Sequence, residues 1–184
     1  IKEQPQSIIR AINNNARIKD NYEVKLGGLD SLKEQLLEID NLIILGCGTS
    51  LHASLIGKTY FDNLYLFNSV IATDGAEFNE AIIPRNGKSA LLLLSQSGET
   101  KDLHRCIEIG RDKGLIIISI VNVVDSMIAR EADCGVYLNA GREVAVASTK
   151  CFTSQLIVLS MISVWFSQNK NTYLMNRKQI IRDL

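Results

Sequence analysis

Two short segments hold the side chains that could do chemistry in this chain. They are residues 46–50, with the sequence Gly-Cys-Gly-Thr-Ser, and residues 95–100, with the sequence Ser-Gln-Ser-Gly-Glu-Thr. Each follows an apolar run and precedes a segment with a helical pattern. Small residues let the backbone turn tightly, hydroxyls donate hydrogen bonds, and the first N–H groups of a helix lack partners within it. These properties predict an anion site, and phosphate is the anion that we expect there.

Hydroxyl groups and helix ends could bind phosphate here without a lysine or arginine. A phosphate monoester carries about −1.5 to −2 charges near neutral pH, and two helix N-termini, at roughly +0.5 each, offset about half of that. Hydrogen bonds to a charged acceptor contribute about 1.5–3 kcal/mol each. The candidate donors are Thr49, Ser50, Ser95, Gln96, Ser97 and Thr100. For one such segment helix capping would be the better interpretation, but two of them favour a ligand site.

A third segment, residues 141–150, precedes another predicted helix and is also rich in small side chains. Within it Ser148 could cap that helix or contact a ligand, and spacing alone leaves both open. Glu143 and Lys150 are a possible acid–base pair, although charged loop residues are usually only solvated. Other phosphate motifs are absent, because Leu51 stands where the dinucleotide fingerprint needs glycine or alanine and no P-loop sequence occurs.

Composition excludes several classes of protein. The chain has 184 residues, 46% of them hydrophobic, which suits one packed domain. Its formal net charge is zero, which argues against nucleic-acid binding. Four cysteines without a C-x-x-C pair and two histidines without an acidic cluster beside them predict no metal site, no disulfide framework and a cytoplasmic location. The longest apolar stretch, residues 156–166, is too short for a membrane span.

Alternating apolar and helical segments predict the fold. We expect strands near residues 42–45, 66–72, 90–94, 115–121 and 135–138. We expect helices over residues 5–19, 29–38, 50–61, 98–113, 126–131, 148–167 and 172–184, with Gly114 closing the fourth of them. Continuous apolar strands separated by helices indicate a three-layer α-β-α sandwich around a doubly wound, five-stranded parallel sheet.

The predicted helix over residues 148–167 is apolar around nearly its whole circumference. It is either a core helix between the terminal helices or a helix whose outer side meets another domain or subunit. We expect residues 1–40 to form a helical lead-in and residues 41–184 to form the ligand-binding domain. Because the chain begins at Ile1, we expect a piece of a larger protein.

Three motifs in this order resemble a known family. They are residues 47–50 (Cys-Gly-Thr-Ser), 95–100 and 146–150 (Val-Ala-Ser-Thr-Lys), and they resemble the sugar isomerase (SIS) domain. More narrowly, the whole chain resembles the first SIS domain of the glutamine–fructose-6-phosphate transaminase (isomerizing) family, the glucosamine-6-phosphate synthases. The resemblance implies the flavodoxin-like strand order and a sugar-phosphate ligand. It assigns the phosphate to the six donors above and the sugar to Val146, Ala147 and Ser148.

The resemblance also implies a partner. In that family a glutaminase domain and a second SIS domain hold the catalytic residues, so we expect no catalytic residue, cofactor or metal in this chain and no activity of the chain alone. We expect it to form a homodimer. Ala145 departs from the glycine usual in the family, and it would strain the loop if the position needed a positive φ. A sensory SIS module and a stand-alone phosphosugar isomerase are the alternatives.

Overall fold

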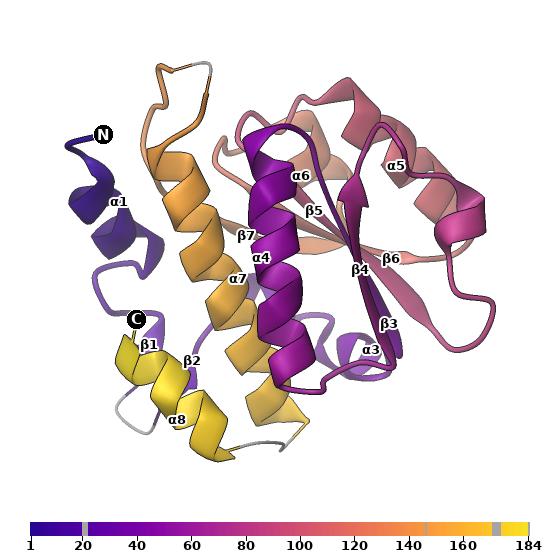
Figure 1. Cartoon of the computed structure of the whole chain (residues 1–184), viewed down its shortest axis with the longest axis horizontal. Coiled ribbons are helices and arrows are strands. Elements are labelled where there is room, and N and C mark those ends of the chain that lie inside the picture. Colours follow the sequence, from indigo (N-terminus) through magenta and orange to yellow (C-terminus); the bar gives the residue numbers. More distant parts are fainter. Residues whose placement is uncertain (20–21, 146, 171–173, 184) are drawn as a thin grey trace.

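The computed structural model describes residues 1–19, 22–145, 147–170 and 174–183. Its centre is a parallel sheet of five strands in the order β4-β3-β5-β6-β7 (Figure 1). The strands are β3 (Asn41–Gly46), β4 (Ser69–Asp74), β5 (Ser89–Ser95), β6 (Ile116–Val121) and β7 (Cys134–Tyr137). Every neighbouring pair is parallel. The predicted doubly wound fold with flavodoxin-like strand order is therefore confirmed.

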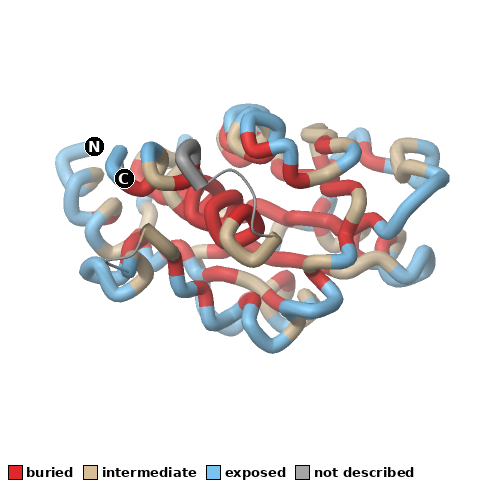
Figure 2. Tube along the Cα trace, turned by 90° about the horizontal axis from the view of Figure 1, so that it is seen from below, coloured by how far each residue is buried: buried red, intermediate tan, exposed pale blue. Residues whose placement is uncertain are grey.

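Both faces of this sheet are buried because its strands carry apolar side chains on both sides. In β3, Leu42 and Ile44 belong to one core cluster, whereas Ile43 and Leu45 belong to the other. Helices α4 (Thr49–Asn63) and α7 (Lys150–Asn169) cover the first face, and α5 (Lys101–Asp112) and α6 (Met127–Glu131) cover the second. Figure 2 shows buried chain through the middle and exposed chain outside it, as the predicted three layers require.

The helices next to the sheet agree with the predicted ones, with one informative difference. The helix expected over residues 98–113 begins only at Lys101, because Gly98 has a φ of +70°, which lies outside the helical region. At its other end Gly114 has a φ of +68°, and the N–H of Leu115 donates to the carbonyl of Gly110. Gly114 is thus the predicted C-terminal stop.

Helix α7 is mainly a core helix. It contacts α4, α1 (Gln4–Ala11) and α8 (Leu174–Asp183), and most of its residues are buried. The helix has 20 residues, so by length and composition it could cross a membrane, contrary to what the apolar stretch suggested. However, 72% of its most apolar window is buried inside the structure, as in the core helix of a globular protein. Of the two interpretations of this helix, a core helix between the terminal helices describes most of its surface.

The first 40 residues differ most from prediction. The helix expected over residues 5–19 ends at Ala11, because residues 13–15 all have positive φ, which asparagine tolerates but a helix does not. An unpredicted antiparallel pair follows, β1 (Ile18–Lys19) and β2 (Glu23–Val24). The helix expected over residues 29–38 is split into α2 (Gly27–Asp30) and α3 (Lys33–Leu37). A short 3-10 helix, η1 (Glu80–Ile82), precedes β5.

Candidate functional site

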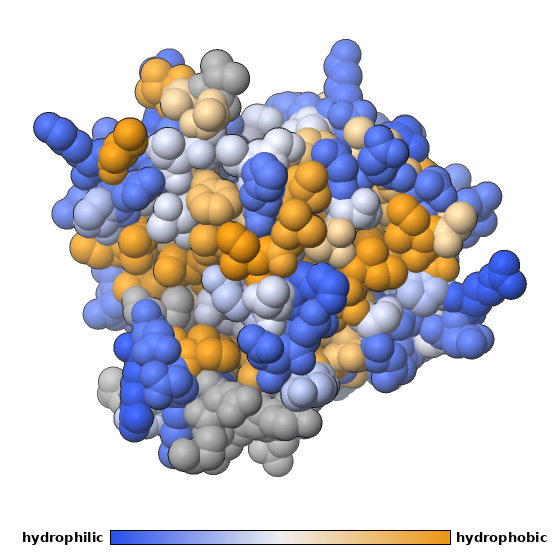
Figure 3. Space-filling model, in the orientation of Figure 1, coloured by the Kyte–Doolittle hydropathy of each residue, from blue (hydrophilic) through white to orange (hydrophobic). Residues whose placement is uncertain are grey.

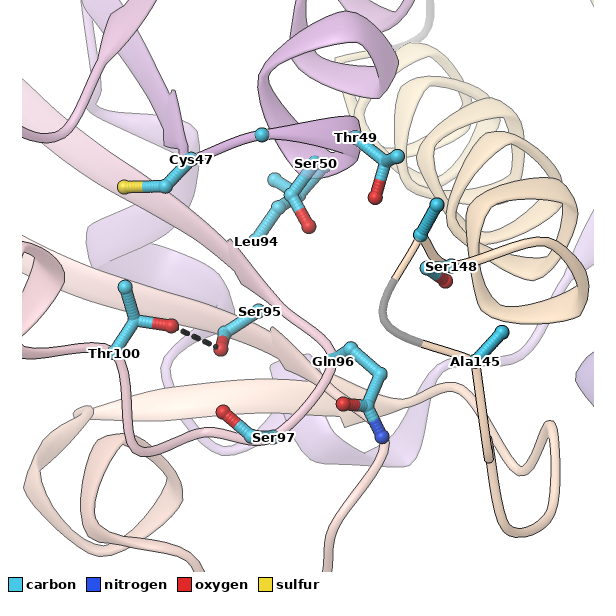
Figure 4. A pocket seen from close by; sticks show the side chains of 12 residues that line it. Cys47, Thr49, Ser50, Leu94, Ser95, Gln96, Ser97, Thr100, Ala145 and Ser148 are labelled. Carbon is cyan, nitrogen blue, oxygen red and sulfur yellow. Dashed lines mark hydrogen bonds between the residues drawn. The ribbon is translucent and has the colours of Figure 1, made fainter.

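The three segments singled out in the sequence meet at one pocket of about 360 Å³. It lies beyond the carboxyl ends of β3 and β5, where the strand order reverses and where doubly wound sheets bind ligands. Its lining residues are Cys47, Gly48, Thr49, Ser50, Leu94, Ser95, Gln96, Ser97, Thr100, Ala145, Ala147 and Ser148. Figure 4 shows them arranged around a common space. Every site residue predicted from sequence belongs to this set except Val146, which lies outside the described residues.

The turn between β5 and α5 is held together by its own hydroxyl groups. Ser95 Oγ accepts a hydrogen bond from the Gly98 N–H at 2.9 Å and lies 3.0 Å from Thr100 Oγ1. Ser97 Oγ accepts one from the Glu99 N–H at 3.1 Å. An oxygen that accepts from an N–H group keeps its own hydrogen for another partner. These side chains therefore shape the turn. Ser97 keeps its hydrogen for a ligand, and the Ser95–Thr100 pair keeps one of its two, because the other lies in the bond between them.

The hydroxyls at the two turns do not cap the helices that follow. Gly48, with a φ of +58°, is the N-cap of α4, and Thr100 is the N-cap of α5; neither helix has a side-chain cap hydrogen bond. The N–H groups of Ser50 and Leu51 donate instead to the backbone carbonyls of Cys47 and Gly48, and that of Leu103 donates to the carbonyl of Thr100, so neither turn uses a hydroxyl as a cap. This favours the ligand interpretation of the two turns over simple capping.

Helix α7 is capped by a carboxylate from the preceding loop. Glu143 Oε2 accepts hydrogen bonds from the backbone N–H groups of Thr149 and Cys151 at 3.1 and 3.2 Å and from Ser148 Oγ at 3.2 Å. Lys150, only 7% exposed, donates to Glu3, the residue before α1, at 2.5 Å. The two charged residues are therefore structural rather than solvated, and neither lines the pocket. The structure does not support them as an acid–base pair.

Replacing Glu143 with glutamine should destabilise the protein at neutral pH, and the loss should fade in acid. Burial raises the pKa of this carboxyl, but the N–H groups of Cys151 and Thr149 and the Ser148 hydroxyl outweigh it, so the pKa lies below its ordinary value of 4.5. Stability from a lowered pKa is present above pH 4.5 and is lost as pH falls through the folded-state pKa. We expect about 0.5–1 kcal/mol at pH 7. Urea unfolding of both proteins from pH 7 to pH 3 measures it; a difference independent of pH would contradict the assignment.

The remaining sequence candidates add no chemistry to the pocket. Burial, together with the Asp74 carboxylate, raises the pKa of the Cys47 thiol to about 11, and its sulfur points away from Thr49 and Ser148 (Figure 4). This agrees with its interpretation as a packing residue. Ala145 is not among the described residues with a positive φ, so the strain considered for that position does not arise. Within the described ranges, no group of three or more His, Cys, Asp or Glu side chains could hold a metal ion.

Sequence reasoning missed one residue next to the site. Gln155 of α7 is 1% exposed and its Nε2 donates to Ser50 Oγ at 2.8 Å. The available signal was an amide in a helix whose other side chains near it are apolar or small hydroxyls. Its contact partner is 105 positions away in sequence, so only the fold could reveal it.

A doubly wound sheet with a hydroxyl-lined pocket at its switch point defines an α/β ligand-binding domain. The model of the SIS domain family matches residues 35–164, more than half of the chain. The chain belongs to the SIS domain family.

Relatives of known name narrow this further. The chain is 38% identical over 174 residues to glutamine–fructose-6-phosphate aminotransferase (isomerizing) of Clostridium acetobutylicum, covering 94% of this chain and 28% of that protein. It is 35% identical over 184 residues to human glutamine–fructose-6-phosphate aminotransferase (isomerizing) 2, and the match covers 100% of this chain and 27% of that protein. The solved C-terminal domain of glucosamine-fructose-6-phosphate aminotransferase from Francisella tularensis superimposes with a TM-score of 0.84 at 28% identity, covering 99% and 50%. The chain thus spans less than a third of the length of the Clostridium acetobutylicum and human aminotransferases.

Proposed function

We propose that this chain is the phosphosugar-binding domain of the isomerase part of a glutamine–fructose-6-phosphate aminotransferase, in the biosynthesis of amino sugars. The pocket carries the proposal. Among the described residues that line it none is charged, and hydroxyls and an amide supply its polar groups. Carboxylates would repel an anion, whereas neutral donors at two uncapped helix N-termini attract one.

The two sides of the pocket have different roles in this proposal. Thr49, Ser50, Ser95, Gln96, Ser97 and Thr100 bind the phosphate of fructose 6-phosphate or glucosamine 6-phosphate. On the other side, Ser148 donates its hydrogen to the Glu143 carboxylate, which can only accept. Ser148 Oγ is then an acceptor, which suits a sugar hydroxyl and not a phosphate oxygen. We assign the sugar to Ala147 and Ser148, and extend the assignment to Val146 from the sequence motif alone.

The activity of the whole protein is part of the same proposal. The matched aminotransferases are three to four times as long as this chain, so a glutaminase domain and a second SIS domain are the proposed partners. We place the catalytic residues there, with no cofactor or metal here and no activity of this chain alone. We also propose a cytoplasmic location without nucleic-acid or membrane binding; the free state of all four cysteines supports a reducing compartment.

Phosphate esters should stabilise the protein. At a ligand concentration one hundred times Kd the gain is about 2.7 kcal/mol, so a thermal-shift titration with fructose 6-phosphate, glucosamine 6-phosphate and inorganic phosphate should raise Tm. Fructose without phosphate is the control and should give no shift. If no phosphate compound shifts Tm, the proposed function is wrong. Steady isomerisation of fructose 6-phosphate by this chain alone would favour a stand-alone isomerase instead.

We further propose that two copies pair through an apolar face on α4 and α7. Leu55 and Ile56 are 47% and 39% exposed, and Leu156 and Ile157 line a hollow of about 260 Å³ beside Tyr60. Figure 3 shows apolar residues gathered across this face. The surface is smaller than the whole circumference of α7, because α1, α4, α8 and the core beneath the helix cover the rest. Light scattering at micromolar concentration should give twice the chain mass of 20.4 kDa; a monomeric mass would contradict the pairing.

A further inference from the structure

Gln155 is a buried amide in direct contact with the candidate anion site. It lies one to two turns into α7 and donates from Nε2 to Ser50 Oγ at 2.8 Å. Ser50 lies in the first turn of α4, is 6% exposed and lines the pocket. The contact therefore links the central helix of one layer to a hydroxyl at the pocket wall.

The direction of this hydrogen bond determines what Ser50 can offer a ligand. An amide N–H group can only donate, so Ser50 Oγ is the acceptor and keeps its own hydrogen. No other hydrogen bond of Ser50 Oγ occurs among the residues that the structure describes. In Figure 4 the Ser50 oxygen points into the space enclosed by the three segments. Its hydrogen is consequently available to an anion in the pocket.

The opposite orientation of the amide is less favourable. As it stands, Gln155 Oε1 has no partner among the described residues. Reversal would pair this oxygen with Ser50 and leave the amide nitrogen without any partner. Buried N–H groups without a partner are rarer in proteins than buried carbonyl oxygens that lack one. The donor orientation toward Ser50 is therefore the one that we adopt.

We propose that Gln155 is a positioning residue, which holds the Ser50 hydroxyl as a hydrogen-bond donor to the bound phosphate. The inference rests on the proposed function, since it assumes an anion in this pocket. The cost of burying the Gln155 amide supports the positioning role. A buried amide with an unpaired oxygen is unfavourable, and an apolar side chain of similar shape would pack at least as well. A residue retained for packing alone would not be expected to carry that amide.

A methionine at this position separates a positioning role from a structural one. Gln155→Met keeps the length of the side chain and removes the N–H group, so Ser50 can rotate its hydrogen away from the ligand. We expect inorganic phosphate and fructose 6-phosphate to bind about threefold to tenfold more weakly, measured by isothermal titration calorimetry in a phosphate-free buffer. We expect thermal stability without ligand to be unchanged or higher. A structural role would produce the reverse pattern.

Three further comparisons between variants sharpen this test. Gln155→Glu places an acceptor and a negative charge beside Ser50 and should weaken binding more than tenfold. In a protein that already carries Ser50→Ala, adding Gln155→Met should lower the phosphate affinity no further, because the effect of Gln155 passes through the Ser50 hydroxyl. Gln168→Met is the matched control on the same helix. Among the residues that the structure describes, Gln168 bonds only the backbone of Val24 in β2, and it does not line the pocket, so this variant should keep full affinity.

The outcomes distinguish the two proposals. If the unmodified chain binds neither phosphate nor fructose 6-phosphate, the proposed function is wrong and the positioning role falls with it. If that chain binds both but folded Gln155→Met binds them equally well, only the positioning role is wrong. Equal losses from Gln155→Met with and without the Ser50 hydroxyl would also contradict it.

Discussion

Replacing Gly46 with alanine should abolish phosphate binding and destabilise the fold by about 3 kcal/mol or more. A Cβ atom at this last residue of β3 would lie 2.6 Å from the carbonyl carbon of Ser50 and 2.9 Å from the Leu51 nitrogen. These are backbone atoms in the first turn of α4, so no side-chain rotation relieves the clash. The turn must move away from the strand, and it takes Thr49 and Ser50 out of the pocket.

Two other glycines provide matched controls for this prediction. A Cβ at Gly48 meets nothing within 4 Å, but the residue has a φ of +58° and a ψ of −126°, which residues with side chains avoid, so Gly48→Ala should cost about 1–3 kcal/mol of strain without a clash. Gly27 in α2 also has free space and lacks a positive φ, so Gly27→Ala should be neutral or slightly stabilising. Urea unfolding and phosphate titration of the three variants test the order. Equal effects of all three would contradict the close-approach argument.

Ser95→Ala should weaken phosphate binding about tenfold to hundredfold and also lower stability by about 1–3 kcal/mol. Ser95 is 2% exposed, and its Oγ accepts the hydrogen bond of the buried Gly98 N–H. Alanine would leave that N–H group without a partner and would release the turn from which Ser97 and Thr100 reach the pocket. The same substitution removes one hydroxyl that we assign to the phosphate.

Ser97→Ala separates the two effects of Ser95. Ser97 is less buried, and among the described residues its Oγ accepts only from the exposed Glu99 N–H, which water can satisfy after the substitution. We therefore expect a clear loss of phosphate affinity with a change in stability below about 0.5 kcal/mol. Calorimetry and urea unfolding of both variants measure the contrast. Unchanged affinity in both would show that these hydroxyls only shape the turn.

The sheet could be predicted from sequence because its strands are buried on both faces. The runs that became β3 and β5 are continuously apolar and each is followed by a hydroxyl-rich turn, and the run that became β6 is apolar except for Ser119. The edge strand β4 was harder, because most of its residues are only half-buried and its pattern is mixed. The N-terminal region was predicted least well. Its helix ends where three asparagines adopt positive φ, a backbone choice that composition alone does not specify.

The side-chain interactions around the pocket were beyond sequence reasoning because they join distant positions. Glu143 was an ordinary loop charge in the sequence, yet it caps α7 through two backbone N–H groups. Lys150 was also an ordinary loop charge in the sequence, yet it is buried and donates to Glu3, 147 positions away. From the sequence, Ser148 could cap the helix or contact a ligand. The structure shows its hydroxyl bonded to Glu143 and the residue lining the pocket. Such pairings depend on how α1, α4 and α7 pack.

The sequence by itself determined the order of the five sheet strands and of the helices between them, and the residues of the two hydroxyl-rich turns, while its motifs pointed by resemblance to the family. It could do so because apolar runs, glycine and hydroxyl chemistry act over a few neighbouring residues. Only the tertiary structure decided that these turns share one pocket with the loop before α7, and which hydroxyls donate and which accept. Donor and acceptor roles depend on partners such as Gln155 and Glu143, and it is the fold that brings those partners to the pocket.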